Sequence, residues 1–363
     1  MNVERKISIR QVMMMFFFTT VAEITRVLTP ESGKFISKSS WISPLIAVLP
    51  VLLLIIILNQ IIKKHEEKSL SQIIEIVFGK IIGKFFLLLF FIHALFFASF
   101  FLRNFGEKFI SSIFPNVSPL FFIIILLLFV LFAVRRNIEY FARFAEFSFI
   151  IISIIFAIAF FVILLNIKPQ NIYPVTYYDS IDILKSSIPV ISLWSLLTFS
   201  LFFGDNINYT GKFKRTATKF MLITALFNIL AMISIIGIFN AETAKNLPMP
   251  FFMIFKSIKS TGLIQSFETF FIILWAFTDF IMITHFMFIM SKIFKTLFST
   301  KEKTANFFMI PVAIIIFILA YFIGENIIDA EYFYTNILSY SSIILGYVLP
   351  FLLLIVGKMR RVL

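Results

Sequence analysis

The sequence predicts an all-α integral membrane protein with ten membrane-spanning helices. The chain has 363 residues, of which 60% are hydrophobic and only 14% are charged, and its mean hydropathy is +1.00. A soluble domain is roughly 45–50% apolar and about 25% charged. Because long apolar runs recur from one end of the chain to the other, a water-soluble core does not account for the excess. A helix that crosses the hydrocarbon core needs about 20 mostly apolar residues, and ten segments meet this requirement.

Short polar connections separate these ten runs. They cover about residues 10–29, 41–62, 81–105, 119–135, 143–165, 187–205, 219–240, 263–291, 306–323 and 333–357. The first run follows basic residues, as the core of a signal peptide does, but no small-residue cleavage site comes after it, so we count it as a span. Residues 66–80 and 248–260 predict two short amphipathic helices that lie in the membrane interface.

The distribution of basic residues predicts the orientation of the spans. With ten spans, alternate connections lie on the same side of the membrane. One set of connections, together with both termini, holds 22 Lys and Arg residues, and the opposite set holds 9. Cytoplasmic connections are the ones enriched in Lys and Arg. The pattern therefore places both termini in the cytoplasm.

Two halves of five spans predict an inverted repeat within a single membrane domain, residues 1–363. An odd number of spans makes the second half start from the opposite side of the membrane. The halves are about residues 10–165 and 187–357, and a predicted interfacial helix precedes the third span of each. Polar residues interrupt the first span of each half. We expect these helices to lose hydrogen bonds near 19–23 and 200–205, and broken helices at corresponding positions predict a substrate site.

The composition argues against several other classes of protein. The formal net charge is +13, but the basic residues form short clusters without interleaved aromatic side chains, so no nucleic acid is expected as a partner. The chain has no Cys, which removes disulfides, thiolate metal sites and cysteine nucleophiles. The three His residues are too scattered for a metal motif, and no phosphate-binding loop or nucleophile motif is present. We expect no enzyme activity, no metal and no cofactor.

Polar and ionisable side chains within the spans are the candidate ligand contacts. The candidates, with the small residues beside them, are Thr19, Thr20, Ala22, Glu23, Thr198, Ser200, Gly204, Asp205 and Asp279. For an amino acid ligand, free N–H groups at the interruptions of spans 1 and 6 would receive the carboxylate. A side-chain carboxylate or backbone carbonyls would receive the ammonium group.

Each candidate also has a structural interpretation. Asp279, near the middle of span 8, either holds an ammonium group or a proton, or ties its helix to a neighbour. Asp205 lines the break in span 6 or caps the helix end. Glu23 faces the ligand pathway or pairs with Arg26, three residues further on. The Ser and Thr hydroxyls offer ligand contacts or bond back to their own helix. The His side chains inside spans 3 and 8 pack with hydrogen bonds or relay protons.

Short motifs over nearly the whole length resemble those of one family, the B subunits of spore germinant receptors, within the amino acid–polyamine–organocation (APC) transporter superfamily. The motifs are Ile7–Ser8 with Gln11, Ser40–Trp41–Ile42, Gly79 with Gly83, Leu102–Arg103 with Phe105 and Glu107, Pro115 with Pro119, Ile138–Glu139 with Ala142–Arg143 and Glu146, Lys185 to Pro189, and Glu268 with Trp275.

The resemblance implies a fold and a function. The fold would be the LeuT/APC-like 5+5 inverted repeat with broken helices 1 and 6. The function would be that of a nutrient-germinant receptor subunit in the spore inner membrane, which binds an amino acid or similar small molecule and signals with A- and C-type subunits. An active secondary amino acid permease is the alternative. A scaffold subunit without a working pocket is a second alternative, because Thr19 to Ala22 stand where the family tends to have Gly.

Overall fold

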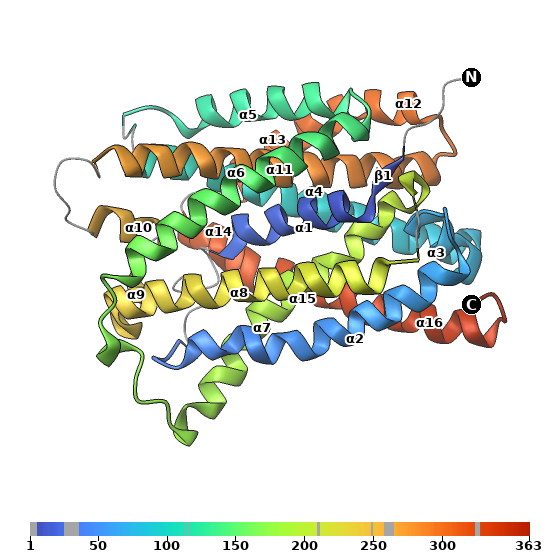
Figure 1. Cartoon of the computed structure of the whole chain (residues 1–363). Helices are drawn as coiled ribbons and strands as arrows, with labels where there is room; N and C mark the ends of the chain where they lie inside the picture. Colours follow the sequence, from blue (N-terminus) through green and yellow to red (C-terminus); the bar gives the residue numbers. More distant parts are fainter. Residues whose placement is uncertain are drawn as a thin grey trace.

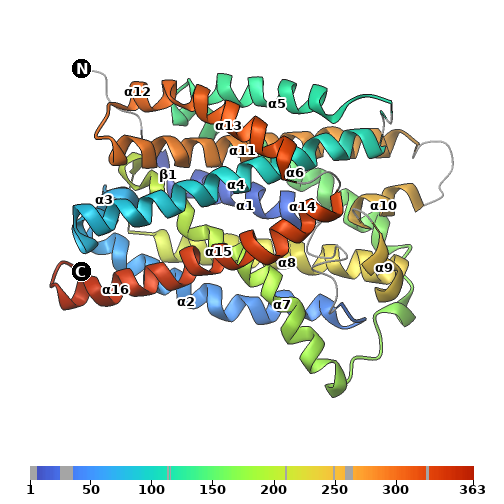
Figure 2. The same ribbon diagram turned by 180° about the vertical axis from the view of Figure 1, so that it is seen from behind.

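Helices that run roughly side by side make up almost all of the computed structural model, as two opposite views show (Figures 1 and 2). The structure describes residues 6–24, 36–112, 114, 116–208, 211–247, 250–257, 265–323 and 327–363. The two short strands and α3 lie at one end of the bundle, which we call the strand end, and the chain also ends there. Helices α9 and α10 lie at the opposite end, which we call the far end.

The first half of the chain supplies six α-helices and one strand. They are β1 (Ile7–Ser8), α1 (Ile9–Ile24), α2 (Ser43–Lys64), α3 (Leu70–Phe78), α4 (Lys80–Ser112), α5 (Pro119–Val134) and α6 (Ile138–Leu164), with a 3₁₀ turn (Ser40–Ile42) before α2. A capping box starts α3, because the Ser69 hydroxyl accepts from the Gln72 N–H and the Gln72 side chain bonds back to the Ser69 N–H. This helix lies within the predicted interfacial segment 66–80.

The second half contains the less regular helices. They are α7 (Ser180–Ser195), the 3₁₀ helix η5 (Leu196–Asn206), β2 (Ile207–Asn208), α8 (Phe213–Phe239), α9 (Ala241–Asn246), α10 (Pro250–Ser257), α11 (Gln265–Leu297), α12 (Glu302–Phe307) and α13 (Met309–Phe322). The last span combines α14 (Ile327–Phe333), α15 (Ser339–Ile343) and α16 (Leu349–Met359) with two π-helical stretches, η6 (Tyr334–Leu338) and η7 (Ile344–Val348). The short 3₁₀ turns Pro169–Asn171 and Tyr177–Asp179 precede α7.

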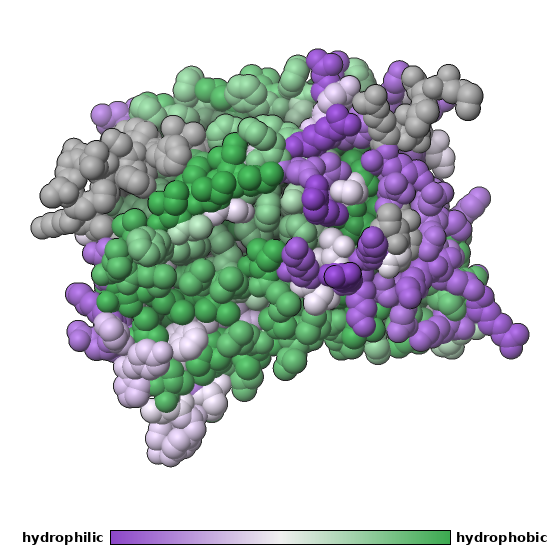
Figure 3. All heavy atoms as spheres, viewed as in Figure 1, coloured by the Kyte–Doolittle hydropathy of each residue, from purple (hydrophilic) through white to green (hydrophobic). Residues whose placement is uncertain are grey.

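The bundle has the surface of an integral membrane protein. In the described part of the chain, eight helices are long and apolar enough to cross a membrane. Two shorter apolar helices, Ile9–Ala22 and Pro119–Val134, coincide with predicted spans 1 and 4. Each predicted span therefore coincides with a helix, although the count of ten full-length spans is not confirmed. Hydrophobic side chains cover the middle of the visible face, and hydrophilic ones gather at the strand end (Figure 3).

The two predicted breaks have different outcomes. Helix α1 is continuous from Ile9 to Ile24, so the break expected near 19–23 is not confirmed, and residues 25–35 lie outside the described part. Span 6 does leave the α-helical conformation. Its α-helix ends at Ser195, and a 3₁₀ helix continues to Asn206 before the chain becomes extended. The departure therefore begins before the predicted 200–205 segment and is a change of helix type.

Spans 1 and 6 lie next to each other, as the inverted-repeat argument requires. Helix α1 packs against η5 and α7. At the strand end, β1 and β2 form a two-stranded parallel sheet in which Ile7 pairs with Ile207 and Ser8 with Asn208. This sheet joins the residues before span 1 to those after span 6. The superposition of the two sequence halves stays a prediction.

Gly204 allows the end of span 6 to approach the loop before α3. A Cβ atom at this position would lie 2.1 Å from the backbone oxygen of Lys68 and 3.0 Å from its carbonyl carbon. A side chain would therefore collide with backbone, which is less able to move than the end of a side chain. The glycine fixes how closely η5 packs against the α2–α3 connection.

We expect Gly204→Ala to destabilise the protein by about 2 kcal/mol, because the added methyl group overpacks a closed backbone contact. Thermal unfolding in detergent measures the change. The matched double variant, Gly204→Ala with Lys68→Ala, should be as unstable as Gly204→Ala alone, since the collision is with the Lys68 backbone. Recovery of stability in the double variant would contradict this explanation.

Candidate functional site

The centre of the bundle is the place where α1, η5 and α11 meet. The Phe203 ring of η5 packs edge-on against the His285 ring of α11, with 5.2 Å between centroids. Four residues earlier, the ring of Phe199 lies 5.8 Å from that of Phe286. Residues three apart share a face of a 3₁₀ helix, so Ser200 lies on the same face of η5 as Phe203. It is one turn nearer the far end than the Phe203–His285 contact.

Three buried polar atoms at this centre have no hydrogen-bond partner among the residues that the structure describes. They are the Ser200 hydroxyl oxygen, the Thr284 hydroxyl oxygen and Nδ1 of His285. Each residue is at most 1% exposed. An unsatisfied buried polar group costs about 1–3 kcal/mol, so these three atoms, on η5 and on the helix α11 that packs against it, are the candidate ligand contacts. Thr284 and His285 were not among the sequence candidates.

The candidates on α1 are committed to their own helix. The Thr19 hydroxyl donates to the Met15 carbonyl at 3.3 Å, and the Thr20 hydroxyl donates to the Phe17 carbonyl at 2.7 Å. Both Thr residues and Ala22 are fully buried. Glu23 lies within α1, but its side chain is outside the described part of the structure. In this arrangement Ala22 and the Thr methyl groups contribute apolar packing to the interior, and the Thr hydroxyls bond to backbone carbonyls of their own helix.

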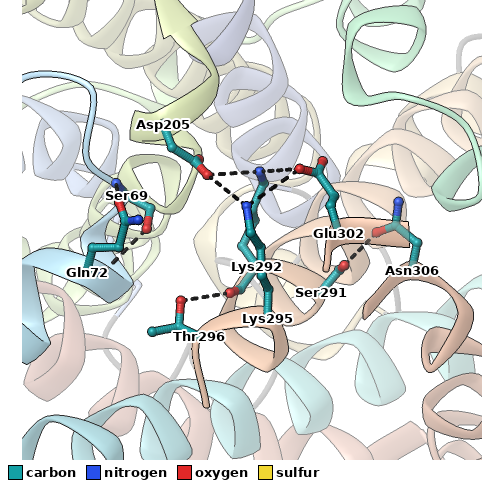
Figure 4. Close-up of polar contacts among 9 residues, drawn as sticks. All are labelled: Ser69, Gln72, Asp205, Ser291, Lys292, Lys295, Thr296, Glu302 and Asn306. Atoms are coloured by element: carbon teal, nitrogen blue, oxygen red, sulfur yellow. Dashed lines mark hydrogen bonds and ion pairs between the residues drawn. The ribbon is translucent and has the colours of Figure 1, made fainter. Parts of the chain in front are cut away.

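Two further candidates on span 6 also have partners. The Thr198 hydroxyl donates to the backbone carbonyl of Gly346, on the last span, at 2.7 Å. Asp205 accepts from Lys292 of α11 at 3.2 Å and lies 3.5 Å from the Lys295 ammonium group. Glu302 of α12 lies 3.4 Å from Lys292 and 3.7 Å from Lys295. We call these four charged residues the Asp205 cluster; it joins span 6 to spans 8 and 9 near the strand end (Figure 4).

Asp279 is fully buried and forms an ion pair. Its two carboxylate oxygens accept from the Lys108 ammonium group of α4 at 2.8 and 3.1 Å. The same ammonium group lies 5.3 Å from the centre of the Trp275 ring, a cation–π contact. The orientation count assigned Lys108 to a connection, but this residue is inside α4. Asp279 precedes His285 by six residues, which is about 9 Å along a helix, so this pair is on the far-end side of the centre.

Besides Asp279, His93 is a buried ionisable residue of the interior. Its Nδ1 lies 2.9 Å from the Ser341 hydroxyl and its Nε2 lies 3.3 Å from the Ser342 hydroxyl. Its ring also packs against Phe199 of η5 at 5.3 Å. The side chain thus joins α4 to the last span. Within the described residues, no group of three or more His, Asp or Glu side chains is arranged to hold a metal ion.

The strand end contains a small cavity between η5 and the α2–α3 connection. Ile62, His65, Leu201, Gly204 and Ile207 are among its lining residues. Burial lowers the pKa of His65, and the nearby charge of Lys68 lowers it further. The imidazole is therefore neutral at pH 7 and adds no charge to this cavity.

Comparisons with known proteins agree with this architecture. The crystal structure of MhsT in complex with L-phenylalanine superposes with a TM-score of 0.64 at 14% sequence identity, covering 96% of this chain and 97% of that one. This similarity confirms the expected LeuT-like transporter fold. In sequence, spore germination protein KB of Bacillus subtilis (strain 168) is 23% identical over 326 residues, which are 88% of this chain and 86% of that protein.

A family model described as spore germination protein matches residues 6–326. This range begins just before β1 and includes both β-strands, the centre where α1, η5 and α11 meet, and the Asp205 cluster. The match therefore includes the candidate ligand contacts on η5 and α11, whereas the last-span partners of Thr198 and His93 lie beyond it. The chain belongs to the family of spore germination proteins.

Proposed function

We propose that this protein is the nutrient-binding membrane subunit of a germinant receptor and that it binds an amino acid or a similar small molecule at the centre of the bundle. Ligand binding shifts the equilibrium between two conformations of the protein, and A- and C-type partner subunits respond to this shift. The protein lies in the spore inner membrane with both termini in the cytoplasm, so the strand end is the cytoplasmic end. The excess of Lys and Arg in the connections at that end supports this orientation.

The observation that carries this proposal is the group of unpartnered polar atoms of Ser200, Thr284 and His285. These atoms offer hydroxyl and imidazole groups, which hydrogen-bond to a carboxylate or an ammonium group. The rings of Phe199, Phe203 and Phe286 pack where η5 meets α11 and would suit an apolar ligand side chain. An amino acid has this combination of a charged backbone and a small side chain.

The alternative is an active secondary amino acid permease. The similarity to MhsT, whose structure contains L-phenylalanine, supports amino acid binding in either role, because a carrier and a receptor would share one pocket design. The Asp205 cluster favours the receptor, since it ties span 6 to spans 8 and 9 at the end where a carrier would have to release its substrate. A scaffold subunit without ligand binding remains the second alternative.

We expect the purified protein in liposomes to bind an amino acid without net uptake. Equilibrium binding of radiolabelled amino acids and uptake under a proton or sodium gradient measure the two properties separately. Gradient-driven uptake would reject the receptor function in favour of the permease. Failure of the assembled receptor complex to bind any amino acid would favour the scaffold function.

Ser200→Ala and Thr284→Val should each weaken amino acid binding by about five- to ten-fold, because each removes one hydrogen bond to a buried ligand. The matched control is Ser187→Ala. This hydroxyl is equally buried, but it donates to the Leu184 carbonyl of its own helix at 2.7 Å. Equal losses of binding in the control and in the two site variants would contradict the proposed site.

We expect the Lys108–Asp279 ion pair to contribute to the stability of the folded protein. Asp279→Asn removes the negative charge that accepts two hydrogen bonds from the buried Lys108 ammonium group, and we expect a loss of about 3 kcal/mol in thermal unfolding experiments. The double variant, Asp279→Leu with Lys108→Met, should recover most of this loss because both charges are removed. If Asp279→Asn has normal stability but no longer binds an amino acid, the structural role is wrong and the carboxylate is a ligand contact.

A further inference from the structure

The 3₁₀ helix η5 is unusually long. It covers eleven residues, Leu196–Asn206, whereas 3₁₀ runs longer than three or four residues are uncommon. The hydrogen bonds of a 3₁₀ helix are less well aligned than those of an α-helix, so an isolated segment of this length would return to the α-helical form. Contacts with other parts of the protein must therefore hold η5 in this conformation. The structure shows contacts near both of its ends.

The first set of contacts is a row of hydroxyl groups that we call the hydroxyl ladder. Three hydroxyls, spaced three residues apart along span 6, donate to backbone carbonyls of the last span. The pairs are Ser192 with Ser339, Ser195 with Ser342 and Thr198 with Gly346, at 2.8, 2.8 and 2.7 Å. The Ser195 hydroxyl also lies 2.6 Å from the Ser192 carbonyl, so its one hydrogen is shared between two acceptors. The accepting residues lie in or beside the π-helical stretches, where the wider turn changes the pairing of backbone groups.

A close backbone approach makes this ladder possible. A Cβ atom at Gly346 would lie 2.4 Å from the backbone oxygen of Ser195 and 2.5 Å from its Cβ atom. Only a glycine allows the last span to come near enough for all three hydroxyls to reach it. Thr198 is the ladder residue inside η5 itself, so its bond fixes the first part of the 3₁₀ helix.

The second set of contacts holds the other end of η5. Asp205 bonds to the buried ammonium group of Lys292, and Gly204 packs against the Lys68 backbone. After Asn206, the parallel pairing with β1 fixes the direction of the chain. The contacts of Thr198 and Asp205 thus fix two points of one segment, and Ser200 lies between these points.

The distance between these points explains the helix type. Seven residue steps separate Thr198 from Asp205. They span about 14 Å in a 3₁₀ helix, which rises about 2.0 Å per residue. They span only about 10.5 Å in an α-helix, which rises 1.5 Å per residue. If η5 became α-helical it would shorten by about 3.5 Å, and Ser200 would rotate by about 40° relative to Thr198.

We propose that Thr198 and Asp205 are positioning residues that hold η5 extended between them and so direct the Ser200 hydroxyl toward the ligand. This inference rests on the proposed ligand site and adds the two attachments of η5 that set the direction of the Ser200 hydroxyl. Loss of either attachment lets the segment shorten into an α-helix and turns Ser200 away from α11. Neither residue touches the ligand.

A distance measurement tests the device without any ligand. Because the chain has no native Cys, the pair Ile188→Cys and Asn208→Cys can be spin-labelled specifically; both side chains are exposed. The distance between the two spin labels, measured by double electron–electron resonance, should shorten by about 3 Å in Thr198→Val and in Asp205→Ala. Lys292 keeps Glu302 as a partner in the second variant. The distance should be unchanged in Thr198→Ser, which keeps the hydroxyl, and in the control Ser187→Ala.

Amino acid binding provides the second readout. Thr198→Val and Asp205→Ala should weaken binding by about five-fold or more, and Thr198→Ser should restore it. Unchanged label distances in both disrupting variants would overturn the positioning role, even if binding falls. Shortened distances in a protein whose wild type binds no amino acid would support the device and reject the proposed function. Failure of the positioning role and failure of the proposed amino acid binding therefore give different results.

Discussion

Every backbone N–H and C=O group inside a bilayer has to find its partner within the protein, because the hydrocarbon offers none. Most of this chain meets the requirement with α-helices. Span 6 and the last span do not, and their irregular stretches η5 and η7 pack against each other. The Thr198 hydroxyl of η5 donates to the Gly346 carbonyl of η7, so a side chain of one irregular helix satisfies a backbone group of the other. The position of Ser200, and with it the candidate site, depends on this mutual arrangement.

Hydropathy was enough to predict the helices, since each of the ten apolar runs coincides with a helix in the described part of the chain and the whole adopts the expected LeuT-like fold. The breaks were harder to place. Polar residues near Thr19 suggested a broken helix, but its hydroxyl and that of Thr20 bond to their own turns and leave α1 intact. The 3₁₀ form of η5 depends on contacts with Gly346 and Lys292, more than 80 residues away, and no local pattern encodes them.

The candidate site was predictable in part. A carboxylate inside a span indicated a buried role, and Asp279 is buried. Its partner was not found because Lys108 was counted with the connections, although a long side chain near a helix end can reach inward as well as outward. Thr284 was missed because its neighbours are strongly apolar, and His285 was considered only as a packed side chain or a proton relay. Only the structure shows that polar atoms of both residues are buried without hydrogen-bond partners among the described residues.

The pairing of β1 with β2 has a consequence for biogenesis. Residues that begin span 1 bond to residues that follow span 6, about 200 positions later, so this contact is highly non-local. During synthesis the ribosome must finish six spans before β2 exists. Until then the N-terminal segment waits on the same side of the membrane with its strand edge unpaired. Insertion of the first helices therefore precedes, and cannot rely on, the sheet that later fixes the start of the chain.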